Sequence, residues 1–108
     1  MCIDPVLQHV KDKRNVILFG IESHVCILQT ALDLLENNIN VHVVVDGTSS
    51  RTQESRKYAF KQMKQAGAVL TTSESVILGL LDGADHPKFR EVQKLILQSA
   101  PVTDLCKL

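Results

Sequence analysis

The sequence predicts an α/β domain built on a parallel sheet, and three observations support that prediction. Residues 15–20 and 41–45 form apolar runs with the composition of buried strands, and residues 68–71 form a third, shorter run. Stretches with helical periodicity lie between these runs. Because this order joins parallel strands through helical crossovers, we expect helices to cover both faces of the sheet.

Capping signals and periodicity define the helices of the first half. Asp4 followed by Pro5 suits the start of a short helix that runs to about Lys11. The first strand ends at Gly20, and a second helix is expected over residues 24–37. One face of that helix carries Cys26, Ile27, Thr30, Ala31, Leu34 and Leu35.

A polar loop is expected over residues 46–50, at the carboxyl end of the second strand. Ser50 and Gln53 would form a capping box for the next helix, which Gly67 ends. The inward positions of this helix would be Ala59, Phe60, Met63 and Ala66.

Two short helices are expected to complete a single domain of residues 1–108. The first covers residues 73–81 and the second begins at Pro87. A short flexible tail is expected from about residue 99. The inward positions of the second helix would be Phe89, Val92, Leu95 and Ile96.

The composition argues against several classes of function. The 108 residues are 44% apolar, which is enough for one modest core. Twelve basic residues balance twelve acidic ones, so the charge provides no footprint for nucleic acid or for an anionic membrane. No apolar run approaches the roughly 20 residues of a membrane span. The three cysteines have no CxxC spacing, and no motif indicates a metal or another cofactor.

The candidate site lies where the strands end, because ligands of parallel sheets bind beyond the carboxyl ends of the strands. Residues 20–26, 46–51 and 71–75 all fall at that edge. Cys26 is the leading candidate, since the first turn of a helix offers free N–H groups and a dipole that stabilise a thiolate. The alternative is that Cys26 is a small buried hydrophobe.

Three polar residues could line a pocket at the same edge. His24 lies two positions from Cys26 along the helix, so a Cys–His dyad is not expected and His24 belongs at the pocket mouth or in solvent. Asp46 and Ser49 could bind a polar group of a substrate. The alternative for both is that they cap loops and helix ends.

The stretch GIESHVCILQTALDLL resembles the nucleophile motif of the isochorismatase-like cysteine hydrolases. VHVVVDGTSSR and AGAVLTTSESVIL resemble the same family, especially its animal isochorismatase domain-containing branch. The resemblance extends from about Pro5 to Gln98. It implies a three-layer α/β/α sandwich with a Rossmann-like, six-stranded parallel sheet, in a family that includes nicotinamidases and isochorismate hydrolases.

The resemblance also implies roles for individual residues. Cys26 matches the nucleophile that attacks a small amide, ester or enol-ether substrate. The backbone N–H groups of Glu22 and Cys26 match the donors of the oxyanion hole. In the family a non-proline cis peptide precedes the first donor, which here is the bond between Ile21 and Glu22.

The chain departs from the family pattern upstream of Cys26. The family triad is Asp–Lys–Cys, and neither Asp4 nor Lys11 stands in the motif of the triad Asp or Lys. We therefore expect a C-terminal half of the domain, with about three of the six strands and no activity alone. The open alternative is a non-catalytic interaction module or subunit built on the partial domain.

The strand at residues 15–20 would then be an exposed apolar edge, which favours self-association or pairing with another chain. A small-molecule substrate is expected if an upstream half completes the site. The expected location is cytoplasmic. Cys106-Lys107-Leu108 resembles a C-terminal peroxisomal address, which is the alternative location.

Overall fold

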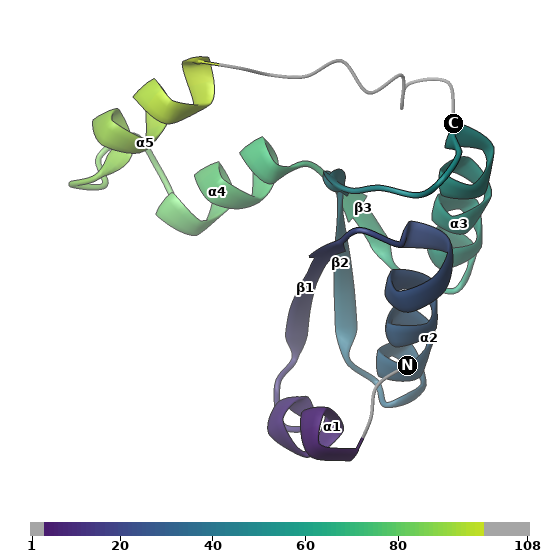
Figure 1. Cartoon of the computed structure of the whole chain (residues 1–108). Helices are drawn as coiled ribbons and strands as arrows, with labels where there is room; N and C mark the ends of the chain where they lie inside the picture. The colour runs from purple at the N-terminus through teal and green to yellow at the C-terminus, as the bar shows by residue number, and fades with distance from the viewer. Residues whose placement is uncertain (1–3, 99–108) are drawn as a thin grey trace.

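A computed structural model of the chain describes residues 4–98 (Figure 1). Strands alternate with helices, and this order confirms the predicted α/β class. The elements are α1 (Asp4–Val10), β1 (Asn15–Gly20), η1 (Ser23–Ile27), α2 (Leu28–Glu36), β2 (Asn40–Thr48), α3 (Gln53–Gln65), β3 (Val69–Thr71), α4 (Ser73–Leu81) and α5 (Phe89–Leu97). The peroxisomal-type tripeptide and the expected tail lie outside the described residues.

The three strands form one parallel sheet in the order β1-β2-β3. Both crossover connections therefore run in the same direction across the sheet. Since parallel crossovers share one hand, α2 and α3 fall on the same face, as Figure 1 shows. Helices lie on both faces as expected, but the cover is unequal, because of the described helices only α4 packs on the opposite face.

The core lies between the sheet and the pair α2 and α3. Alternating valines of β2 point toward these helices, and Val41 and Val43 are fully buried or nearly so. Phe60 and Met63 of α3 are completely buried against them. Each such side chain contributes about 1.5–3 kcal/mol through burial. The other buried core residues are Ile27, Leu28, Ala31, Leu34, Ile39, Val45, Ala59 and Ala68.

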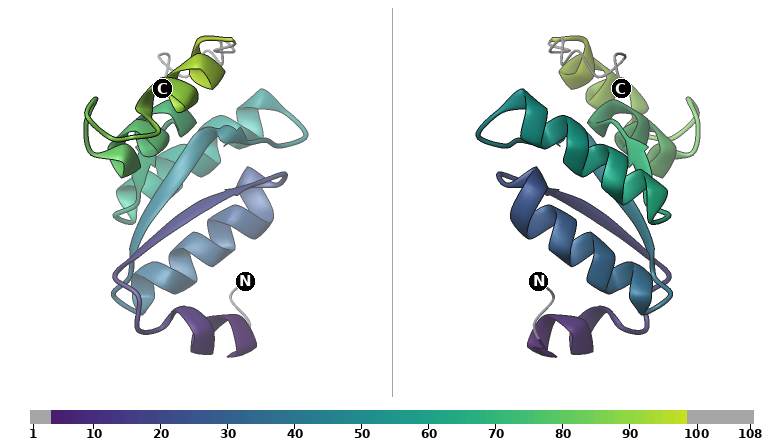
Figure 2. Two further views of the ribbon diagram at one scale, coloured as in Figure 1. Left: turned by 90° about the vertical axis from the view of Figure 1, so that its left-hand side faces the viewer. Right: turned by 90° about the vertical axis from the view of Figure 1, so that its right-hand side faces the viewer.

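The opposite face of the sheet is covered only at its carboxyl end. Ile17 and His42, which pair in register, line a depression on this face together with Val76, Gly79 and Leu80 of α4. Beyond α4, α5 extends away from the sheet, and α1 lies at the other end of the molecule (Figure 2). None of the residues of α5 is buried. Phe89, Val92 and Ile96 of the expected inward face are half-buried, but Leu95 is 68% exposed, so the prediction is wrong for Leu95.

Several predicted boundaries need correction. β2 continues through Thr48, so Asp46 belongs to the strand and the polar loop begins only at Ser49. The N-cap of α3 is Thr52, whose hydroxyl accepts a hydrogen bond from the Ser55 amide, and not Ser50. Ala66 is exposed because it follows the last turn of α3 as the C-cap. None of the helices in residues 4–98 combines the length and apolar character needed to cross a bilayer.

Candidate functional site

The three segments predicted to meet at the carboxyl edge of the sheet do meet there. The loop after β1 is hydrogen-bonded to the loop after β2 through Ser23 and Ser49. The end of β2 is bonded to the start of α4 through Asp46 and Ser73. The parallel register of β1, β2 and β3 causes this convergence, because all three strands end at one edge.

Ser49 holds the segment that leads from β1 to Cys26. Its amide donates to the Gly20 carbonyl over 3.1 Å, and its hydroxyl donates to the Ile21 carbonyl over 3.2 Å. Its carbonyl accepts two hydrogen bonds from Ser23, one from the amide at 2.6 Å and one from the hydroxyl at 2.9 Å. Ser23 is completely buried, so the start of the following turn is fixed in position.

Cys26 lies in η1, a single π-helical turn, and its side chain is exposed. The helix expected over residues 24–37 is thus divided into this turn and α2. The alternative that Cys26 is a small buried hydrophobe is wrong. Single π-helical turns are rare and are found frequently at functional sites.

Glu22 and His24 lie beside this turn. The Glu22 carbonyl accepts hydrogen bonds from the amides of Val25 and Ile27, over 3.2 and 3.1 Å. The Nδ1 atom of His24 lies 2.8 Å from the Ser50 hydroxyl and 3.7 Å from the Oε2 atom of Glu22. That carboxylate oxygen is buried and has no hydrogen-bond partner among the described residues. His24 therefore bridges the two loops.

The Ile21–Glu22 peptide is trans, because no peptide bond in residues 4–98 is cis. The expected cis bond is therefore not present. A cis bond between non-proline residues costs about 2.5–4 kcal/mol and needs surroundings that enforce it. Ile21 is 81% exposed, so packing around this side chain supplies no such constraint.

Asp46 is engaged by the start of α4. One carboxylate oxygen accepts from the Ser73 amide over 2.8 Å, and the other accepts from the Ser73 hydroxyl over 2.6 Å. Thr72 adds a second cap by accepting from the Ser75 amide. The structure thus gives Asp46 the capping role that the sequence left open as its alternative.

Comparisons with known proteins identify the family of this fold and site. Residues 4–75 match the model of the isochorismatase domain. The chain belongs to the isochorismatase family. It is 51% identical over 106 residues to isochorismatase domain-containing protein 2 of Xenopus laevis, and 46% identical over 103 residues to isochorismatase domain-containing protein 1 of Danio rerio. These alignments cover 98% and 95% of the chain.

Solved structures show the same relationship. The structure of MAR1 ribonuclease from Caenorhabditis elegans is 66% identical and superposes with a TM-score of 0.89, over 97% of this chain and 55% of that one. An octameric hydrolase of unknown specificity from Escherichia coli is 28% identical, with a TM-score of 0.64, over 86% and 53%. The chain spans about half the length of the protein 2 relative (52%) and about a third of the protein 1 relative (36%).

Two residues of this isochorismatase-family site were missed by the sequence reasoning. Arg56 of α3 is 9% exposed, and its guanidinium donates to the carbonyls of Val45 and Thr48 at the end of β2. A signal was present, because Arg56 occupies the same helical stripe as Ala59, Phe60 and Met63. Ser23 is the second, and its burial depends on a contact 26 residues away that no local pattern shows.

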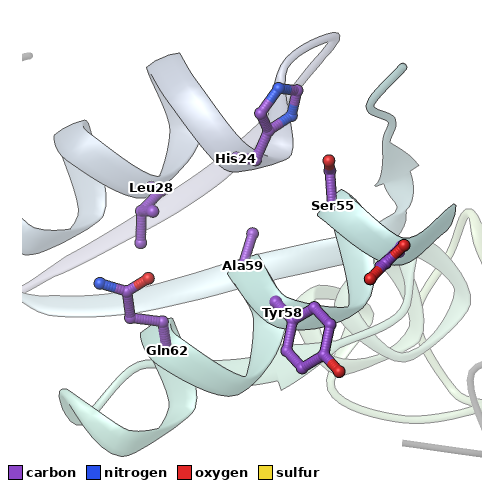
Figure 3. Close-up of a pocket in the computed structure, with 7 residues that line it drawn as sticks. His24, Leu28, Ser55, Tyr58, Ala59 and Gln62 are labelled. Carbon is purple, nitrogen blue, oxygen red and sulfur yellow. The ribbon is translucent and has the colours of Figure 1, made fainter. Parts of the chain in front are cut away.

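A groove borders this site, between α3 on one side and η1 with the start of α2 on the other (Figure 3). His24 and Leu28 form one wall, and Tyr58 and Gln62 belong to the other. Cys26 is not among its lining residues. Within residues 4–98, no group of three or more His, Cys, Asp or Glu side chains is arranged to hold a metal ion.

Proposed function

We propose that this chain is the nucleophile-bearing portion of an isochorismatase-like hydrolase and that Cys26 is its nucleophile. One observation carries the proposal: an exposed cysteine lies in the turn that follows β1, at the edge where three loops meet. Membership of the isochorismatase family supports it. The site opens to solvent, as attack on a substrate requires.

The proposed chemistry is acyl transfer to sulfur. The Cys26 thiolate attacks the carbonyl carbon of a small amide or ester, and a carbon–sulfur bond forms as the amine or alcohol leaves with a proton. The backbone N–H groups of Glu22 and Cys26 would stabilise the negative charge on the carbonyl oxygen. Water then hydrolyses the thioester and releases the acid. Enol ethers are a further substrate class that the family resemblance suggests.

We further propose that the chain is catalytically incomplete alone. Proton transfer to and from the sulfur needs an acid–base group. The Asp and Lys that the family resemblance implies are not matched by Asp4 or Lys11. The chain also covers only about half of the length of isochorismatase domain-containing protein 2 of Xenopus laevis. A second polypeptide segment would therefore have to supply these groups.

The first test is the alkylation rate of Cys26 at neutral pH, resolved by mass spectrometry from Cys2 and Cys106. We expect native Cys26 to react with iodoacetamide faster than Cys26 in the denatured chain, as a nucleophile held in a folded site does. If native Cys26 reacts no faster than the denatured residue, the nucleophile proposal is wrong.

A second measurement tests completion of the site. The chain is mixed with the upstream part of the 66% identical Caenorhabditis elegans protein and assayed against small amides and esters. We expect hydrolysis only in the mixture, with an acyl group detected on Cys26 by mass spectrometry. Cys26→Ser is the control and should abolish both signals. RNA belongs in the panel because that relative is named a ribonuclease. Cleavage of RNA without acylation of Cys26 would contradict the acyl-transfer proposal and indicate a nuclease instead.

A non-catalytic interaction module is the second candidate, and the exposed edge of the sheet favours it. β1 has no neighbour on its outer side among the described residues, and Phe19 on this strand is 70% exposed. Such an edge can pair with another chain or with a second copy.

A cytoplasmic location, with the peroxisomal alternative, stays a prediction. A reporter fused to residues 97–108 tests it.

A further inference from the structure

We propose that Arg56 is a positioning residue for the Cys26 turn. Its guanidinium holds the irregular end of β2, and the residue that follows that end, Ser49, shapes the segment that leads to Cys26. The importance of this arrangement for catalysis rests on the proposed function. The arrangement itself can be tested without it.

Arg56 is a buried cation whose charge no described carboxylate balances. It is 9% exposed, and no ion pair joins it to Asp or Glu within residues 4–98. Arginine stays charged in proteins, and burying a charge is costly unless hydrogen bonds compensate it. A residue of this kind is expected only where its hydrogen bonds hold something in place.

The guanidinium donates hydrogen bonds to two backbone carbonyls at the end of β2. Nε donates to the Thr48 carbonyl over 3.1 Å, and Nη2 donates to the Val45 carbonyl. Nη1 makes a longer contact of 3.4 Å with the side-chain oxygen of Gln53. The Phe60 ring lies beneath the guanidinium, 5.2 Å from ring centre to Cζ, and adds a cation–π contact.

These carbonyls lie where the sheet ladder is interrupted. Leu18 pairs with Val43, but Gly20 pairs with Thr48, so two positions along β1 correspond to five along β2. In such an irregular stretch the regular ladder is broken and backbone carbonyls need other donors. Arg56 supplies two of these donors, and the Thr48 hydroxyl supplies another to Val45 over 3.3 Å.

The bulged end of β2 in turn places Ser49. Ser49 makes four hydrogen bonds with Gly20, Ile21 and Ser23, which together define the path into η1. The backbone N–H groups of Glu22 and Cys26 belong to that path and the turn it enters. A shift of the β2 end would therefore move the Glu22 amide relative to the Cys26 amide and sulfur.

Arginine suits this task better than lysine. A planar guanidinium can donate to two carbonyls in fixed directions, whereas an ammonium is a point charge on a flexible stem. Arg56→Lys keeps the charge and most of the apolar stem but loses the fork. Arg56→Met keeps the volume and removes the charge. The two variants separate geometry from charge.

The test measures site-resolved amide exchange by NMR, together with the Cys26 alkylation rate, on the full chain. In both Arg56 variants we expect the Ser23 amide to exchange at least tenfold faster relative to the core amide of Val43. We also expect Cys26 alkylation to fall toward the rate of the denatured chain. Met63→Ala is the matched control, because it destabilises the same helix but leaves the hydrogen bonds from Arg56 to Val45 and Thr48 in place.

Each result bears on the proposal. Met63→Ala should accelerate both amides together and leave their ratio unchanged. An unchanged Ser23-to-Val43 ratio in Arg56→Lys and Arg56→Met would overturn the positioning role, as would complete unfolding of both variants. If Cys26 of the unmodified chain shows no enhanced reactivity, the proposed hydrolase function fails, and faster Ser23 exchange in the variants would still support the role of Arg56.

Discussion

Asp46, at the carboxyl edge of the sheet, has a structural role: it caps the start of α4. Its carboxylate accepts two short hydrogen bonds from Ser73, at the first turn of α4. The start of a helix carries partial positive charge and free N–H groups, so a carboxylate there is favourable. Asp46 thus joins β2 to α4, and the proposed nucleophile at this edge is Cys26.

Replacing Asp46 should therefore destabilise the fold. Asp46→Ala removes both hydrogen bonds and the charge, and should lower the free energy of unfolding by about 1–2 kcal/mol. Asp46→Asn keeps one acceptor and should cost about half as much. Urea unfolding followed by circular dichroism measures both. Asp12→Ala, at an exposed position, is the control. A loss no larger than that of the control would contradict the capping role.

At the residue scale, the sequence identifies the candidate reactive residue more readily than the residues that hold its surroundings in place. Cys26 could be singled out because its residue type and place after a strand are both visible locally. Ser23 could not, because its burial depends on the Ser49 carbonyl, which a separate strand brings to it. Arg56 stood on a predicted core stripe, but its partners are backbone carbonyls, which carry no signature in a sequence.

At the element scale, η1 shows why a local pattern can miss a backbone distortion. Periodicity correctly placed Ile27, Ala31 and Leu34 on the buried face. The π-helical turn is not local in origin, because its first residue is held by Ser49 across the sheet edge. Helical periodicity therefore predicted the buried face and missed the turn that presents Cys26.

The N-cap of α3 gives an element-scale prediction. Thr52→Ala should lower the free energy of unfolding by about 1 kcal/mol, since the Thr52 hydroxyl accepts from the Ser55 amide over 3.0 Å. Thr52→Ser should restore most of the loss. Arg51→Ala, at the exposed neighbouring position, should change the unfolding free energy by less than about 0.5 kcal/mol. Thermal and urea unfolding check the series, and equal losses for Thr52→Ala and Arg51→Ala would refute the cap.

At the scale of the whole molecule, the order of the strands decides which surfaces stay open. Three parallel strands in sequential order place both crossover helices on one face. The other face has only α4 near its carboxyl end, and it exposes an apolar strip on and just after β1. Alternation along the strand places Ile17 and Phe19 on the same side, at 40% and 70% exposure. The class of the fold was predictable from local runs, but this unequal cover of the two faces follows from the pairing order.

The strip on β1 should make the chain associate. An unpaired strand edge beside exposed apolar side chains is a template for another strand, so we expect a reversible dimer or larger species in sedimentation velocity as concentration rises. Phe19→Lys places a charge on the strip and should shift the chain toward monomer without loss of secondary structure. Tyr58→Lys is the matched control, because Tyr58 is 56% exposed on α3, away from β1. A chain that sediments as a monomer at every concentration would refute the association. If Tyr58→Lys disperses the oligomer as well as Phe19→Lys does, the interface lies on the helical face instead.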